Sequence, residues 1–237
     1  DGHVGYSAGS TGTVTVTGAG STWTNSGDLH VGNSGTGTLT IENGGKVSNG
    51  NIGYVGWNGG SGTVTVTGAG SSWTNGDRLG VGNGTLTIAD GGAVSNTVGT
   101  IAGQLGSTGT VTVTGAGSTW TNSGNLVITS VGVLRVEDGG AVSSASGRLG
   151  INSGSASATV TGAGSTWLNN GMLEDGELHV GAAGTGTLIV ENGGWVKSAS
   201  GYIGYASGST GTATVSGTDS LWAVHGLLDV GHDGTGA

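Results

Sequence analysis

The chain has 237 residues, of which 57 are glycine, while proline, cysteine and phenylalanine are absent. Five basic and 14 acidic residues give a formal net charge of −9, which argues against nucleic-acid binding by phosphate neutralisation and against an anionic membrane surface. The composition also excludes disulfides, zinc–thiolate sites, collagen and a membrane-inserting helix, and so much glycine disfavours helices in general, so we predict an all-β protein.

The first element in chain order belongs to a repeat that runs through the whole chain. Gly-Ala-Gly-Ser-x-Trp occurs four times and returns in a degraded form at 217–222. Its tryptophans are 50, 47, 47 and 55 residues apart and form a predicted core column: Trp23, Trp73, Trp120, Trp167 and Trp222. A second anchor, Ile/Val-x-Asn/Asp-Gly-Gly, lies between them at 41–45, 88–92, 136–140 and 190–194. Both anchors are diverged copies of one unit of roughly 23 residues, and two units make a repeat of about 47 residues.

Within each unit the apolar residues alternate with polar ones, as in a half-buried strand. Three short strands are expected per unit, near the Thr-Val-Thr-Val, Trp/Val and Leu-x-Val segments, with turns of Gly, Asn and Ser between them. Two apolar columns run through Val14 and Val16 and their equivalents, and the third alternates Trp with Val. The predicted fourth column is Val4, Leu29, Ile52, Leu79, Ile101, Leu126, Leu149, Leu178, Ile203 and Leu228.

One unit cannot bury its own apolar face, but stacked units bury all four columns in a continuous core. Parallel crossovers are overwhelmingly right-handed, so we predict a right-handed parallel β-helix of about nine to ten rungs, roughly 45 Å long. Residues 1–237 are expected to form a single array of four full double-rung repeats with partial ends, as a segment of a longer chain.

The turns carry their own pattern of glycine and asparagine. Doubled glycines such as Gly44-Gly45 and Gly91-Gly92 suit a positive φ. An Asn follows four of the tryptophans by two residues, and we interpret these as turn residues that bond to the backbone: Asn25, Asn75, Asn122 and Asn169.

The units resemble the type V secretion (autotransporter)/PEP-CTERM-associated repeat, and the segment "VTVTGAGSTWTNSGDLHVGNSGTGTLTIENGGKVSN" at 14–49 carries the resemblance. The resemblance covers essentially the whole chain. It implies a β-helical passenger segment that is exported to the bacterial cell surface or secreted, and that is often adhesive. It brings no catalytic residues and no cofactor with it.

Two carboxylates at a suitable spacing would indicate a glycosidase, which needs two carboxyl groups about 5–9.5 Å apart. Glu42, Glu137 and Glu191 occupy one slot of the repeat, with Ala89 in the second copy. Alternate rungs are roughly 9.6 Å apart, so Glu137 and Glu191 are the one candidate pair. Because an active site is a local departure from a repeat, a solvating role is the better interpretation, and no catalytic, cofactor-binding or metal residue is assigned.

Local departures from the repeat are the candidate contact sites. Five extra residues between Trp167 and Leu178 predict a loop that could contact a partner through Met172, Leu173, Glu174, Asp175 and Glu177. Trp57 and Trp195 have no counterparts in other copies and could be exposed aromatics that stack on sugar rings. Two histidines share an outward position of the repeat, His30 and His179, whereas His3, His225 and His232 share no clear position. Three tyrosines share another position, in the core or at its rim: Tyr6, Tyr54 and Tyr205.

The threonines suggest a different function, because Thr-x-Thr recurs in five successive units from Thr13/Thr15 to Thr110/Thr112. Such rows resemble the flat faces of ice-binding β-helices. Val133 and Arg135 interrupt them, and Thr is also a good strand former on an exposed face.

The favoured function is a structural extracellular β-solenoid, an autotransporter-like passenger that acts as a stalk, adhesin or fibre-forming unit, for example in a biofilm. The alternatives are a polysaccharide-binding or polysaccharide-degrading β-helix and an ice-binding protein. Both ends fall in mid-repeat, from Asp1 to Ala237, so self-association end to end or side by side is expected. Other expected partners are a host or matrix carbohydrate or protein, without nucleic acid and without direct membrane insertion.

Overall fold

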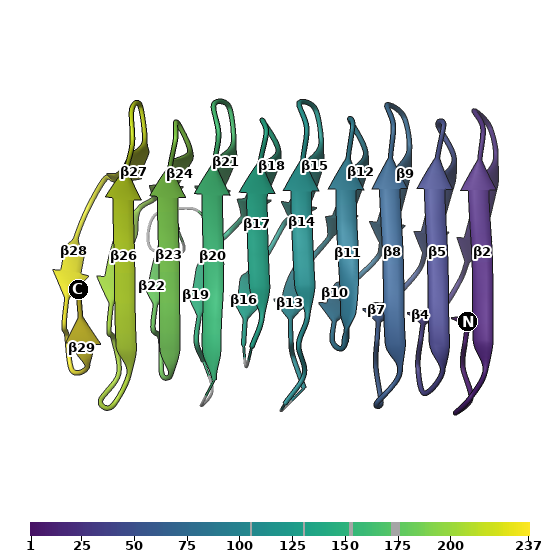
Figure 1. Ribbon diagram of the computed structural model, residues 1–237, viewed down its shortest axis with the longest axis horizontal. Helices are drawn as coiled ribbons and strands as arrows, with labels where there is room; N and C mark the ends of the chain where they lie inside the picture. Colours follow the sequence, from purple (N-terminus) through teal and green to yellow (C-terminus); the bar gives the residue numbers. More distant parts are fainter. Residues whose placement is uncertain (105, 130, 152–153, 172–175) are drawn as a thin grey trace.

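The structure is a computed structural model that describes residues 1–237 with the exception of 105, 130, 152–153 and 172–175. Its strands form three parallel sheets, called A, B and C here, and the chain visits them in that order in every rung (Figure 1). Each strand pairs with the strand three positions later, so successive rungs stack. This is the right-handed parallel β-helix that the sequence predicts, with about nine turns.

The strands have the following bounds. Sheet A consists of β1 Gly2–Val4, β4 Leu29–Val31, β7 Gly53–Val55, β10 Arg78–Val81, β13 Val98–Ile101, β16 Leu126–Ile128, β19 Gly147–Leu149, β22 Glu177–Val180, β25 Ser200–Ile203 and β28 Leu228–Val230. Sheet B consists of β2 Thr11–Thr17, β5 Thr36–Glu42, β8 Ser61–Thr67, β11 Gly84–Ala89, β14 Thr110–Thr114, β17 Val133–Glu137, β20 Ser155–Thr161, β23 Thr185–Glu191, β26 Thr210–Ser216 and β29 Thr235–Gly236. Sheet C consists of β3 Thr22–Asn25, β6 Lys46–Asn49, β9 Ser72–Asn75, β12 Ala93–Asn96, β15 Thr119–Asn122, β18 Ala141–Ser144, β21 Thr166–Asn169, β24 Trp195–Ser198 and β27 Leu221–Val224.

Sheet B shows why the alternating segments form strands. Val14 pairs with Leu39 and Val16 with Ile41, while the intervening threonines point outward. The same register continues through the later strands, so the first two predicted apolar columns are confirmed. Leu39 and Ile41 are fully buried. A period of two, repeated at one register, therefore builds one wall of the core.

The predicted fourth column is wrong, because sheet A contributes two inward columns. One alternates Gly with Leu: Gly2, Leu29, Gly53, Leu79, Gly99, Leu126, Gly147, Leu178, Gly201 and Leu228. The other is aliphatic throughout: Val4, Val31, Val55, Val81, Ile101, Ile128, Leu149, Val180, Ile203 and Val230. Ile52 belongs to neither and lies half-buried just before β7.

The glycines of the first column make room for the tryptophans. A Cβ added at Gly99 would lie 2.8 Å from Cζ2 of Trp120, and one at Gly147 would lie 2.6 Å from Cζ2 of Trp167. Rungs with Trp in sheet C thus carry Gly in sheet A and rungs with Val carry Leu, so each indole extends over the glycine of its own rung. Trp73, Trp120 and Trp167 are fully buried, whereas Trp23 and Trp222, in the terminal rungs, are half-buried.

The asparagines two residues after the tryptophans are not turn residues, which corrects that part of the sequence-based interpretation. Three of them do bond to the backbone, as predicted: Asn75, Asn122 and Asn169. They end the strands of sheet C, have no positive φ, and Asn75, Asn122 and Asn169 are almost fully buried. The indole Nε1 of Trp120 donates to Oδ1 of Asn96 (2.8 Å), and that of Trp167 donates to Oγ of Ser144 (3.1 Å). A buried indole N–H needs an acceptor, and the preceding rung supplies it.

The turns between sheets B and C combine a positive φ with a buried hydroxyl. At Asn43-Gly44 both residues have a positive φ, 54° and 83°, and the N–H of Gly45 donates to the carbonyl of Glu42. Only the first glycine of the predicted pair therefore needs its conformational freedom. The N–H of Gly44 donates to Oγ of Ser71 in the next rung (3.0 Å), which explains the serine of Gly-Ala-Gly-Ser.

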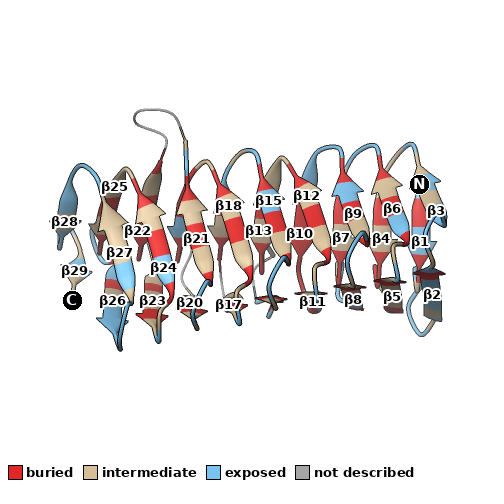
Figure 2. Ribbon diagram, turned by 90° about the horizontal axis from the view of Figure 1, so that it is seen from above, coloured by how far each residue is buried: buried red, intermediate tan, exposed pale blue. Residues whose placement is uncertain are grey.

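Burial depends on having a rung on both sides. Figure 2 shows buried residues along the middle of the array and exposed ones on β26 and β28. Val215, Leu221, Leu228 and Val230 are each about half exposed. Within the described part of the chain, no helix is long and apolar enough to cross a membrane.

Candidate functional site

The outward row of sheet A departs most from the repeat. The middle residue of each three-residue strand, and its equivalent in the longer strands, points away from the core: His3, His30, Tyr54, Gly80, Thr100, Val127, Arg148, His179, Tyr202 and Asp229. His3 therefore shares the slot of His30 and His179, which the sequence interpretation missed. Imidazoles and phenols gather at the two ends of this row and form two clusters.

The N-terminal ring cluster consists of His3, Tyr6, His30, Tyr54 and Trp57. The rings of His30 and Tyr54 stack with centroids 4.7 Å apart at 19°, and Trp57 packs on Tyr54 at 4.7 Å. Tyr6 lies 4.3 Å from His3 and is 49% exposed. Tyr54 is in register with His30, so the predicted common slot of Tyr6, Tyr54 and Tyr205 is wrong for Tyr54. The exposed Tyr6 and Tyr205 are not core residues.

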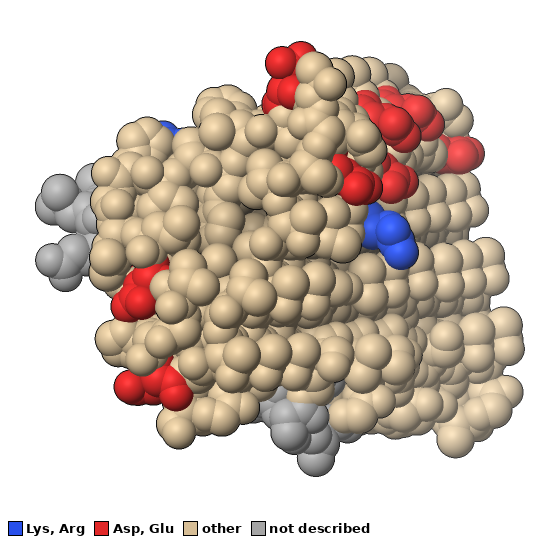
Figure 3. Space-filling model, turned by 60° about the vertical axis from the view of Figure 1, so that its left-hand side comes forward, with Lys and Arg blue, Asp and Glu red and all other residues tan. Residues whose placement is uncertain are grey.

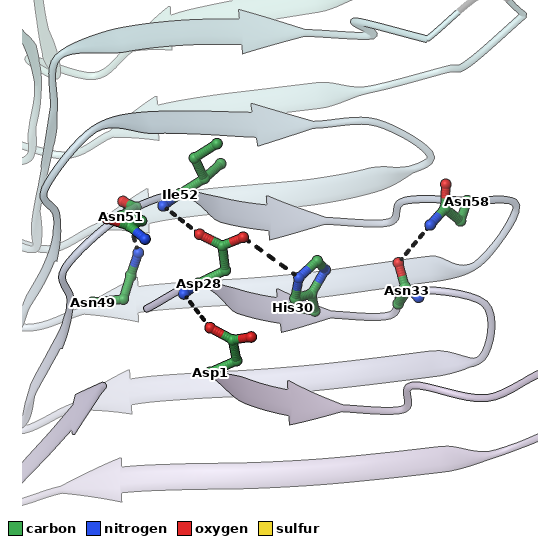
Figure 4. A network of polar contacts seen from close by, with 8 residues as sticks. All are labelled: Asp1, Asp28, His30, Asn33, Asn49, Asn51, Ile52 and Asn58. Carbon is green, nitrogen blue, oxygen red and sulfur yellow. Dashed lines mark hydrogen bonds and ion pairs between the residues drawn. The ribbon is translucent and has the colours of Figure 1, made fainter. Parts of the chain in front are cut away.

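Polar contacts around His30 of this cluster tie neighbouring rungs together (Figure 4). The N–H of Asp28 donates to Oδ1 of Asp1 (2.9 Å), and the N–H of Ile52 donates to Oδ1 of Asp28 (3.1 Å). Nε2 of His30 lies 4.0 Å from Oδ2 of Asp28. Burial lowers the pKa of His30, the neighbouring His3 lowers it further, and Asp28 opposes the change. A neutral imidazole is therefore favoured inside the N-terminal ring cluster.

The C-terminal ring cluster consists of His179, Tyr202, Tyr205 and His232. His179 stacks on Tyr202 at 4.6 Å and meets Tyr205 edge-on at 4.8 Å. On the other side, Tyr205 stacks on His232 at 5.1 Å and 9°. Nδ1 of His232 contacts Oδ2 of Asp229 at 2.7 Å. Desolvation, followed by the charge of Glu177, raises the pKa of Tyr202.

His179 is held in one tautomer by its neighbour. Nε2 of His179 donates to Oε2 of Glu177 at 2.9 Å, because a carboxylate can only accept. The imidazole is 7% exposed and the carboxylate 30%. Burial lowers the pKa of His179 more than the hydrogen bond to Glu177 raises it. The pair therefore presents a fixed carboxylate at the surface, beside a neutral imidazole.

A hollow of about 280 Å³ lies beside this pair. It is lined by Arg148, Ile151, Glu177, His179, Tyr205 and three alanines. A larger hollow of about 480 Å³ lies elsewhere, lined by asparagine, serine, alanine and glycine from Asn122 to Gly171. The smaller hollow combines a cation, a carboxylate, a neutral imidazole and an aromatic ring, so it is the candidate functional site.

The sequence-predicted contact residues are only partly in this region. Met172, Leu173, Glu174 and Asp175 lie outside the described residues, whereas Glu177 lines the hollow. Trp57 belongs to the N-terminal ring cluster, and Trp195 is 39% exposed on sheet C. Arg148 and Tyr202 were missed, although counting back from the aliphatic column of sheet A places both in the outward row.

The repeated carboxylates are elsewhere, at the carboxyl ends of the strands of sheet B. Figure 3 shows acidic side chains gathered along this edge at the top of the molecule. Thr161 separates Glu137 from Glu191 in the register. The adjacent acids and amides bond to threonines one rung away, as when Oγ1 of Thr67 donates to Oδ2 of Asp90 (3.1 Å). Among the described residues, no group of three or more His, Asp or Glu is placed to hold a metal ion.

The Thr-x-Thr rows are in register on β2, β5, β8, β11 and β14 and are then interrupted by Val133 and Arg135 on β17. They form an outward face of sheet B. Because a β-branched residue suits an exposed strand, sheet formation is a sufficient reason for these rows.

Comparison with known proteins adds little to this geometry. No family model and no curated protein sequence matches the chain. One solved structure, described as the crystal structure of the TibC-catalyzed hyper-glycosylated TibA55-350 fragment, is similar at 18% identity and a TM-score of 0.32. The alignment covers 99% of this chain and 95% of that one.

Proposed function

We propose that the chain is a structural β-solenoid of the bacterial cell surface or the secreted fraction, which serves as a stalk or adhesin segment. The observation that carries the proposal is the uninterrupted parallel register of three sheets, with one core running from β2 to β25. Such a core makes each rung a template for the next and produces a rod rather than a closed globule.

The outward surface supports the same role. Sheet B presents rows of threonine and serine, and the turns are built from Gly, Asn and Ser. These polar residues keep the rod soluble and favour the strands and turns that they occupy. The ring clusters of sheet A are therefore the part of the surface that differs from the repeat. The proposal therefore assigns recognition, and not catalysis, to the exposed faces.

Localisation on intact cells tests the proposal. An antibody raised against the folded 237-residue chain is expected to label unpermeabilised cells of the source organism, or to detect the chain in the culture medium. External protease treatment of the cells is expected to remove the surface signal. Detection only after permeabilisation would contradict the proposal.

Absence of catalysis is tested separately on the purified chain. Incubation with a panel of bacterial and plant polysaccharides is expected to release no reducing sugar above that of a heat-denatured sample. Turnover of any member of the panel would replace the scaffold with the polysaccharide-degrading alternative.

A further inference from the structure

We infer that the hollow between Arg148, Glu177 and Tyr205 is a binding site for a neutral saccharide. The inference rests on the proposed function, because it names the ligand class that an adhesin segment of this kind would recognise. It assigns the site to the three rungs that contain β19, β22 and β25.

The first argument is the position of the Tyr205 ring. His232, from the following rung, stacks on one side of this ring. The other residues that line the hollow belong to the rung of Tyr205 itself or to the two preceding rungs, so they lie on the side away from His232. His179 and Tyr202 also contact the ring, and Tyr205 remains 38% exposed. The exposed part of the ring can therefore pack against the C–H face of a sugar while its neighbours hold it in place.

The second argument is the pairing of a donor with an acceptor. Arg148 is exposed, makes no ion pair with any described residue, and carries five N–H donors. Glu177 uses Oε2 for His179 and keeps Oε1 as an acceptor. Adjacent sugar hydroxyls both donate and accept, so they can bond to a guanidinium and a carboxylate at the same time. An anion would bond to the guanidinium alone, and a cation to the carboxylate alone.

The third argument is preorganisation. His179 is almost fully buried and contacts Tyr202 and Tyr205, which also contact each other, and its hydrogen bond fixes the carboxylate of Glu177. Arg148 and His179 are neighbours in the register of sheet A. Side chains that are held in place before binding lose less conformational entropy when the ligand arrives.

The volume and charge of the hollow indicate which saccharides it can bind. A hollow of about 280 Å³ is at the small end of ligand sites and suits one sugar ring with part of a neighbour. Arg148 and Glu177 balance each other's charge in the hollow, and the chain as a whole has a net charge of −9, so a neutral sugar is favoured over a uronate or another anionic sugar.

The site is tested by NMR titration of the purified 237-residue chain with methyl glucoside, methyl galactoside, methyl mannoside and glucuronate. At least one neutral glycoside is expected to bind with a dissociation constant on the order of 1 mM, which is usual for about a dozen heavy atoms. Shifts are expected at Arg148, Glu177 and Tyr205. Absence of binding to every neutral glycoside, or a preference for glucuronate, would overturn the inference.

Variants locate the site. Tyr205→Ala is expected to weaken binding about tenfold and Tyr205→Phe to preserve it, because the ring and not the hydroxyl makes the contact. Glu177→Gln is expected to weaken binding while the melting temperature changes little. Tyr6→Ala is the matched control, since Tyr6 is an exposed tyrosine in the same slot at the other end of sheet A. Equal affinities of Tyr205→Ala and Tyr6→Ala would place binding elsewhere and refute the assignment.

The two proposals fail in different experiments. Surface labelling without saccharide binding would leave the solenoid at the cell surface and remove the sugar site. Saccharide binding by a chain found only inside cells would keep the site and remove the surface function.

Discussion

Sheet C and the outward row of sheet A are built from the same rungs, but they differ in how strictly they repeat. In sheet C, Trp alternates with Val from Trp23 to Trp222, and each indole that follows another rung has an acceptor at the end of the preceding strand. The outward row of sheet A instead runs from His3 to Asp229 with imidazole, phenol, glycine, aliphatic and guanidinium groups.

The difference shows which residues are constrained by stacking and which are not. A residue in sheet C touches its equivalents in both neighbouring rungs, so its size must complement theirs. A residue in the outward row of sheet A faces solvent on one side, so its identity can vary without disturbing the core. We therefore expect substitutions in the inward Trp/Val column of sheet C to change stability, and substitutions in the outward row of sheet A to change recognition.

The largest effect is expected for Trp120→Ala. The change removes a fully buried indole from the middle of the array, so we expect the free energy of unfolding to fall by about 3–5 kcal/mol. Denaturant unfolding measures it. Trp195→Ala, at a position 39% exposed on the same sheet, is the control and is expected to change stability by no more than about 0.5 kcal/mol. Equal effects of the two variants would refute the assigned column.

Gly99→Ala tests the space under the indole. The new Cβ would collide with Oδ1 of Asn122 and lie 2.8 Å from Cζ2 of Trp120, so we expect overpacking to cost about 1–3 kcal/mol. The control is Gly80→Ala in the outward row, where the new Cβ would be no closer than 3.4 Å to its nearest neighbour, Trp57. This control is expected to unfold at nearly the same denaturant concentration as the natural chain. If Gly99→Ala did so too, the indole and the glycine would not be packed as described.

Asn96→Ala tests the acceptor of the indole N–H. It removes the 2.8 Å bond to Trp120 and the 2.7 Å bond to Asn122, and leaves a buried donor unpaired, at a cost of about 1–3 kcal/mol. Asn96→Ser is expected to recover part of the loss, since Ser144 occupies this slot naturally and accepts from Trp167. A serine variant no more stable than the alanine variant would show that the hydrogen bond is not the source of the effect.

The smallest effect is expected from pH. Folding lowers the pKa values of His30 and His179. As the pH falls through 6.5, these histidines therefore take up protons in the unfolded chain before they do so in the folded chain. Stability is therefore greatest above pH 6.5 and falls as the pH decreases through 6.5 toward the lowered values. Melting temperatures between pH 8 and pH 5.5 measure this slope. His179→Gln is expected to make the slope shallower, and an unchanged slope would rule out this histidine as a source.

Sequence reasoning worked best where a pattern repeats. The period of two in the Thr-Val-Thr-Val segments and the recurrence of the tryptophans were enough to predict the β-helix and the columns of sheet B. The prediction is wrong at sheet A, because Gly53, Gly99 and Gly147 occupy inward positions there and have no aliphatic side chain to mark them in the sequence. A glycine that accommodates a large neighbour looks, in the sequence, like a glycine in a turn.

The fold class, the rung and the order of strands follow from local alternation in the sequence and from its repetition. The side-chain neighbours follow from the three-dimensional structure alone. It places Arg148 beside His179, Tyr205 against His232, and each indole over the glycine of its own rung. The physical reason is that contacts between rungs join residues more than 20 positions apart, and one residue gained or lost in a turn changes which side chains stack.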